Sequence, residues 1–136
     1  MAISVVVALT MLGAPAPASA APPYPGTIET TTHARASRTH IPVGAAAYAV
    51  ARVRVGGNAY PQGRMVVIWD GNTGKNYRMV KYKSQDRVVV GPAYLPRGTY
   101  DVRVYYFPTQ GSVYQRSSDS FTQVVMKRRA YNTLYG

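Results

Sequence analysis

The chain has 136 residues and contains no cysteine. It has no disulfide that would stabilise a fold under oxidising conditions, and no thiolate for a metal site. The absence also excludes attachment of a lipid to a cysteine. The fold must therefore be stabilised by burial of apolar side chains.

Acidic residues are scarce, with five against sixteen lysines and arginines. Acid–base catalysis needs two ionisable groups that lie close together in different environments. The five carboxylates instead lie in turn-like segments or at outward strand positions; they are Glu29, Asp70, Asp86, Asp101 and Asp119. No Gly-x-Ser-x-Gly elbow and no glycine-rich phosphate loop before a helix occurs. The sequence therefore predicts a protein that is not an enzyme and that uses no cofactor.

Metal-binding patterns are also weak. His33 and His40 are the only histidines, and their polar surroundings predict that both face solvent. The segment 70–74 begins like a calcium loop, but Lys81 stands where the bidentate glutamate belongs. We therefore interpret this segment as a hairpin turn of the Asp-Gly kind and expect no metal site.

The shortage of acidic residues leaves a formal net charge of +11, all of it at or after Glu29. A field of this sign attracts polyanions in general. Nucleic acid, anionic lipid and the acidic polymers of a cell envelope are all compatible with it. The charge by itself does not choose among these partners.

A long apolar run occurs at the start of the chain, from Ile3 to Leu12, and small residues follow up to Ala18-Ser19-Ala20. This layout predicts a secretory signal peptide over 1–20, although no basic residue precedes the run. The run is about half of the roughly 20 residues that cross a bilayer. We expect a flexible linker over 21–26 and a secreted, extracellular protein. The alternative is a short buried strand.

Helical periodicity is nearly absent after Ala20, whereas segments with a period of two recur. The predicted strands cover 27–33, 46–55, 64–69, 77–83, 87–90, 100–106 and 121–127. In the strand 100–106, the even-numbered residues are predicted to face the core, while Asp101, Arg103 and Tyr105 face outward. Trp69 is predicted to be a core residue. Seven short strands separated by turns predict an all-β, immunoglobulin-like antiparallel sandwich, with a small closed barrel as the alternative.

The segments YPQGRMVVIWDG, LPRGTYDVRVYY and YQRSS, followed by an apolar strand, resemble the bacterial Ig-like domains that occur as repeats in secreted and surface proteins. The residues that carry the resemblance are Pro61, Gly63, Pro96, Gly98, Thr99, Tyr100, Tyr106, Tyr114 and Ser117. The resemblance covers about 27–127 and implies a non-enzymatic module that spaces, adheres or binds. This chain departs from the family in its single copy and its strongly positive charge. Tyr100 is expected to form a tyrosine corner.

Basic residues that alternate with tyrosines form the candidate binding surface. Its residues are Arg78, Lys81, Tyr82, Lys83, Arg103 and Tyr105. Arginine and lysine bind phosphate or carboxylate groups, and tyrosine rings stack on sugars or bases. The alternative is that these charges protect strand edges and keep the domain soluble.

The sequence therefore predicts a secreted, non-enzymatic Ig-like module that binds an anionic envelope polymer or an extracellular partner protein. One alternative is a structural or decoration domain of a surface or virion assembly, and a nucleic-acid-binding protein is the other. The tail 128–136 is basic and contains tyrosine. It is expected to be either an adhesive arm or a disordered end.

Overall fold

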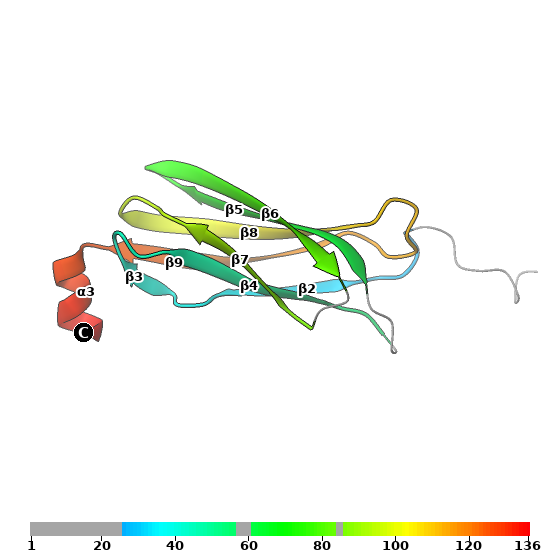
Figure 1. Ribbon diagram of the computed structural model, residues 1–136, viewed down its shortest axis with the longest axis horizontal. Helices are drawn as coiled ribbons and strands as arrows, with labels where there is room; N and C mark the ends of the chain where they lie inside the picture. The colour runs from blue at the N-terminus through cyan, green and yellow to red at the C-terminus, as the bar shows by residue number, and fades with distance from the viewer. Residues whose placement is uncertain (1–25, 57–60, 84–85) are drawn as a thin grey trace, which may run out of the picture.

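The structure is a computed structural model that describes residues 26–56, 61–83 and 86–136. The predicted signal peptide and nearly all of the predicted linker lie outside the described residues. The described part of the chain forms eight strands in two packed sheets and one short helix (Figure 1).

The smaller sheet has the order β2–β4–β7 and consists of β2 (Thr31–Ala36), β4 (Ala47–Arg54) and β7 (Val88–Ala93). The larger sheet has the order β3–β9–β8–β5–β6. Its strands are β3 (His40–Pro42), β9 (Ser117–Met126), β8 (Gly98–Pro108), β5 (Gln62–Gly71) and β6 (Gly74–Lys83). Helix α3 (Arg128–Tyr135) follows β9 at the C-terminal end.

The core lies between the two sheets, because every second side chain along each central strand points inward. In β5, the side chains of Met65, Val67 and Trp69 are fully buried, and so are the even-numbered residues of β8 from position 100 to 106. The odd-numbered residues of β4 that face them are mostly alanines. Small side chains on one sheet leave room for large aromatic ones on the other, so the two layers can interdigitate. Each fully buried large apolar side chain contributes about 1.5–3 kcal/mol.

The predicted all-β sandwich is confirmed, with eight described strands rather than about seven. Neighbouring strands of the described sheets pair antiparallel except β3 and β9, in which His40 lies beside Val124 in parallel register. The closed-barrel alternative is not what the described strands form, because they divide into two separate sheets. Within the described residues, no helix has the length and apolar character needed to cross a bilayer.

The expected tyrosine corner is present at the start of β8. The hydroxyl of Tyr100 donates to the carbonyl of Pro96 over 2.6 Å, while its ring is fully buried. The bond ties the corner between β7 and β8 to the core, as in immunoglobulin-like sandwiches. Trp69 is also fully buried, as predicted, although its indole Nε1 has no partner among the described residues.

Three segments differ from the expectation. Strand β3, at His40–Pro42, was not among the predicted strands. The first strand of the smaller sheet begins at Thr31 rather than at position 27, because Ile28 pairs with the β8–β9 loop through its N–H and the Val113 carbonyl. The tail is a helix rather than a disordered end, and Arg128 donates from it to the Val43 carbonyl. Neither contact is visible in local sequence patterns, because each joins segments about 85 residues apart.

Candidate functional site: a basic groove

The register of the larger sheet aligns basic residues from different strands on its outer face. Lys81 of β6 pairs with Arg64 of β5, and Arg64 pairs in turn with Phe107 of β8. Because neighbouring strands lie about 4.7–4.9 Å apart, these three side chains form a row across the sheet. The next outward residue of β6, Lys83, continues the basic surface toward the end of the sheet.

The β8–β9 loop lies beside this row and forms one wall of an open groove with a volume of about 1150 Å³. We call it the basic groove; its charged and aromatic lining consists of Arg64, Lys81, Lys83, Phe107, Tyr114 and Arg116, with the edge of Tyr82. No carboxylate is among the described residues that line it. The groove therefore gathers four basic side chains in its lining.

Phe107 organises the centre of the basic groove. The guanidinium carbons of Arg64 and Arg116 lie 5.9 and 5.3 Å from its ring centroid. Tyr105, two residues earlier on the same face, stacks on the ring with a centroid separation of 6.2 Å. Cation–π contacts of this kind contribute about 0.5–1 kcal/mol at exposed positions. The contacts hold both guanidinium groups beside the ring, and Arg64 Nη1 also lies 3.8 Å from the sulfur of Met79.

Gly63 fixes how closely β5 and β8 approach below the groove. A Cβ atom at this position would lie 2.1 Å from the carbonyl oxygen of Phe107. Any side chain there would push the two strands apart. Glycine is therefore required where Arg64 and Phe107 must sit side by side.

Backbone hydrogen bonds hold the loop that forms the wall. The N–H of Thr109 donates to the Gln62 carbonyl, and the N–H of Ser112 donates to the Thr109 carbonyl. Gln115 donates to the Ile28 carbonyl on the other side. These bonds connect the loop to β5 and to the segment before β2, so the wall of the groove is part of the folded domain.

The six sequence-predicted site residues separate into four groups. Lys81 and Lys83 line the basic groove, as the candidate surface requires. Tyr82 lies between them and is 1% exposed, so its placement on the outer surface was wrong. Its hydroxyl accepts a hydrogen bond from the N–H of Val53 over 3.1 Å. The reason is the strand period, because Tyr82 lies on the opposite face from its two lysine neighbours.

Arg78 lies outside the groove. Its Nε–H donates to the carbonyl of Pro92 over 3.0 Å, so the side chain connects β6 of the larger sheet to β7 of the smaller one. This contact joins the two sheets at their open side. Arg78 therefore has a structural role in addition to its charge.

Arg103 and Tyr105 lie on the outer face of β8, next to the groove but not in its lining. The Nε of Arg103 lies 3.1 Å from a carboxylate oxygen of Asp101. The Tyr105 hydroxyl and then the Asp101 carboxylate raise the pKa of the Arg103 guanidinium. The charge of Arg103 is therefore paired within the chain, whereas Tyr105 extends the aromatic surface from Phe107.

Sequence reasoning did not identify Arg64, Phe107 and Arg116 as site residues. The hairpin between positions 71 and 74 sets Arg64 opposite Lys81, so counting back from that turn would have found this pair. No local pattern in the sequence indicates that Arg116 lies near this pair. The position of Arg116 depends on the path of a loop that returns to the same face of the sheet.

The arrangement suits binding of anions. Guanidinium and ammonium groups supply several hydrogen-bond donors at fixed positions, and the rings of Phe107 and Tyr105 supply flat apolar contact beside them. Within 26–56, 61–83 and 86–136, no cluster of three or more His, Asp or Glu side chains has the arrangement of a metal site.

No family model, no curated protein and no solved structure matches this chain.

Proposed function

We propose that this protein is a non-catalytic β-sandwich module that binds an anionic polymer in the basic groove. The observation that carries the proposal is the convergence of Arg64, Lys81, Lys83 and Arg116 on one open groove with no described carboxylate in its lining. Like charges at such separations repel one another, and a bound anion relieves that repulsion.

An extended polymer fits the groove better than a small anion. The cations come from neighbouring strands and from a loop, so they are spaced across the sheet rather than gathered around one point. A chain of repeating anionic groups contacts several of them at once, and each contact strengthens the others by raising the effective concentration. Phe107 and Tyr105 offer flat surfaces against which sugar rings pack.

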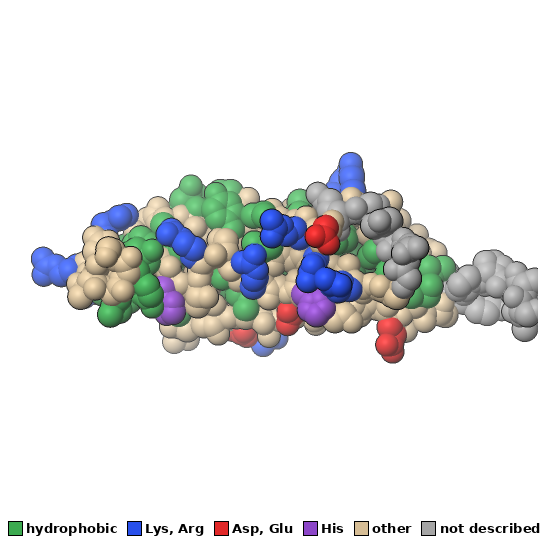
Figure 2. Space-filling model, turned by 90° about the horizontal axis from the view of Figure 1, so that it is seen from below, with side chains coloured by type: hydrophobic (Ala, Val, Ile, Leu, Met, Phe, Trp, Pro, Cys, Tyr) green, Lys and Arg blue, Asp and Glu red, His purple; other side chains and the backbone are tan. Residues whose placement is uncertain are grey.

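The charge of the whole molecule supports the same partner. Lysine and arginine side chains are spread along the length of the side shown in Figure 2, whereas acidic side chains are few. Such a field increases the rate at which polyanions encounter the groove. We further propose that the protein is exported, so that the polymer is an acidic component of the cell envelope, consistent with the resemblance to bacterial Ig-like domains.

The test compares two double variants that each remove two positive charges. Arg64→Gln/Arg116→Gln changes the groove, and the control Arg97→Gln/Arg129→Gln changes two exposed arginines elsewhere. Binding to dextran sulfate is measured by titration calorimetry at 50 and 300 mM NaCl. We expect the groove variant to bind about tenfold more weakly, since each lost charge-assisted contact contributes about 1 kcal/mol or more.

Binding of the unmodified protein is expected to weaken as salt rises, because the Debye length falls below about 10 Å above 0.1 M. Equal losses in the two double variants would refute a specific groove. Tighter binding of a single-stranded oligothymidylate than of a polysaccharide of equal charge would identify nucleic acid as the polymer. Circular dichroism of each variant establishes that the sandwich is folded.

A further inference from the structure

Strand β6 has a long unpaired edge. It pairs with β5 along one side, and no described strand pairs with its other side, where Arg78 crosses to the Pro92 carbonyl of β7. The other outer strands are shorter or covered. Strand β7 has a proline near its end, at position 92. Strand β2 contacts β9, because the N–H of Ala34 donates to the Asp119 carboxylate. At ten residues, β6 is the longest outer strand among the described residues.

The register of the hairpin shows which backbone groups face this edge. Gly71 pairs with Gly74 across a two-residue loop, so this pair and every second pair after it exchange hydrogen bonds within the ladder. The N–H and C=O groups of Tyr77, Met79 and Lys81 therefore point away from β5. The bond from the Tyr77 N–H to its neighbour's side chain, Asn76 Oδ1, at 2.8 Å agrees with this assignment.

The same residues carry the side chains of the outer face. Tyr77 and Met79 are 58% and 51% exposed, which is unusual for large apolar residues in the middle of a strand. Lys75 and Lys81 flank them, two residues away on either side. No acidic residue occurs in β6. The edge therefore combines outward backbone groups at Met79 and Lys81, a central apolar pair and two flanking lysines, of which Lys75 lies 3.9 Å from a carboxylate oxygen of Asp70.

We propose that the β6 edge binds an extended segment of an acidic partner protein by strand addition, in which the segment becomes a sixth strand of the larger sheet. Backbone hydrogen bonds to Met79 and Lys81 supply affinity, and alternate side chains supply specificity. Directly opposed side chains of opposite charge stabilise such a pair. The segment thus carries two apolar residues at alternate positions, opposite Tyr77 and Met79, with an acidic residue two positions beyond each.

A second copy of this chain does not have that pattern. Pairing β6 with itself would bring Lys75, Arg78 and Lys81 against lysine and arginine of the same strand, and like charges directly opposite each other are destabilising. The net charge of +11 on each copy adds long-range repulsion. The complementary occupant is therefore an acidic segment of a different protein.

The test uses a blocked seven-residue peptide with glutamate at its first and seventh positions, isoleucine at the third and fifth, and threonine elsewhere. This pattern reads the same from both ends, so it fits parallel or antiparallel addition. The control peptide replaces both glutamates by lysine. Titration of the full chain at 150 mM NaCl is followed by NMR, with hydrogen exchange of the β6 amides. We expect exchange at Met79 and Lys81 to slow at least tenfold, and the lysine peptide to bind at least tenfold more weakly.

Two variants separate the edge from the basic groove. Lys75→Glu lies outside the groove lining and is expected to weaken the glutamate peptide about tenfold, because an attractive pair becomes a repulsive one. Met79→Pro removes an edge N–H without removing a ladder bond, so the peptide should no longer bind. Spectral changes centred on Phe107 and Arg116, equal binding of both peptides, or protection of the Met79 amide by self-association would each overturn the proposal.

Discussion

Three buried tyrosines join the core of this sandwich to its backbone. Tyr82 accepts from the Val53 N–H, Tyr100 donates to the Pro96 carbonyl, and Tyr106 donates to the Gln62 carbonyl over 2.7 Å. Each side chain buries a large ring and satisfies its hydroxyl at a neighbouring strand or corner. In a chain without cysteine, the bonds of Tyr82 and Tyr106 provide specific cross-links between segments far apart in the sequence, while that of Tyr100 fixes a local corner.

Tyr106 lies below the basic groove, and burial, followed by the neighbouring Tyr114 and Tyr82, raises its pKa to about 12. The neutral hydroxyl is therefore favoured in the folded state, whereas an unfolded tyrosine ionises near pH 10. The resulting stabilisation is complete below about pH 10 and is lost as the pH rises toward 12.

We expect Tyr106→Phe to cost about 1 kcal/mol at neutral pH, through loss of the bond to Gln62. The difference in unfolding free energy between the two proteins should shrink between pH 10 and the raised pKa of about 12, since phenylalanine does not ionise. Urea unfolding at several pH values measures this difference. A difference that stays constant over that range would contradict the prediction.

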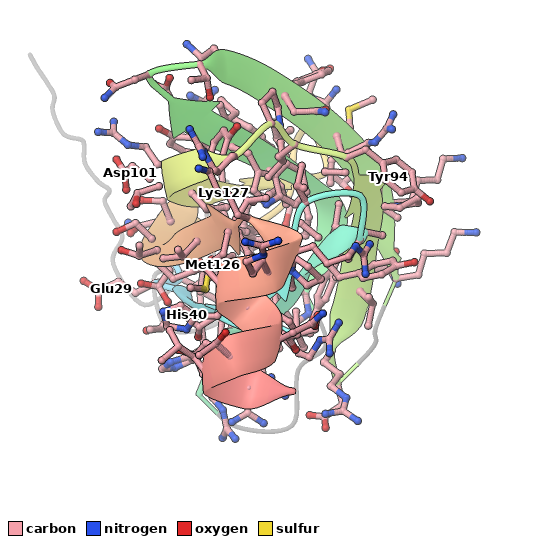
Figure 3. All side chains as sticks on the ribbon, turned by 90° about the vertical axis from the view of Figure 1, so that its left-hand side faces the viewer. Glu29, His40, Tyr94, Asp101, Met126 and Lys127 are labelled. Atoms are coloured by element: carbon pink, nitrogen blue, oxygen red, sulfur yellow. The ribbon has the colours of Figure 1, made fainter. Side chains whose placement is uncertain are left out.

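At the scale of single elements, helix α3 is the least integrated part of the described chain. None of its residues is buried. Its contacts with the sandwich include the exposed hydrogen bonds from Arg128 to the Val43 carbonyl and from Arg38 to the Tyr131 hydroxyl. Tyr135 also stacks on His40 with a centroid separation of 5.1 Å. Figure 3 shows the helix covering one end of the sandwich, with His40 and Met126 next to it.

Removal of residues 128–136 is therefore expected to lower the unfolding free energy by about 1 kcal/mol or less, since exposed contacts of this kind contribute little. Binding of dextran sulfate at 150 mM NaCl should change by less than about twofold, because α3 lies at the opposite end of the sandwich from the β8–β9 loop (Figure 1) and the lost charges are screened. Urea unfolding and calorimetry measure the two quantities. Unfolding of the truncated chain at 25 °C would show that α3 is part of the core fold.

At the scale of the whole molecule, repulsion among the positive charges outweighs the attraction within ion pairs. The described residues contain three ion pairs, all exposed, and two of them have nitrogen–oxygen distances of 3.9 Å. Pairs of this kind contribute about 0–1 kcal/mol each. They offset little of the repulsion that a formal charge of +11 produces.

We therefore expect added salt to stabilise the fold. Raising NaCl from 10 to 200 mM should increase the midpoint of thermal unfolding by several degrees, which corresponds to about 1 kcal/mol for a domain of this size. Calorimetric scans measure the midpoint. The variant Arg64→Gln/Arg116→Gln serves as the control, because a similar rise in that protein excludes specific anion binding in the groove as the cause. A fall in the midpoint would contradict the repulsion argument.

Much of the sandwich follows from local sequence. The alternation in β5 and β8 predicts which side chains are buried, and the corner before Tyr100 predicts its hydrogen bond, because strand period and turn chemistry act over a few neighbouring residues. The same alternation places Lys81 and Lys83 together on the outer face. It also places Tyr82 in the core, so the prediction that Tyr82 belongs to the binding surface conflicts with the strand period.

The basic groove was decided by the tertiary structure. Arg64 and Arg116 are 52 positions apart in the chain, and they meet over Phe107 only because three strands pair in one register and a loop returns beside them. The docking of α3 and the short β3 depend on contacts of the same long-range kind. The sequence by itself determined which faces are apolar and how much charge the surface carries, while the register and the loop path determined where that charge gathers.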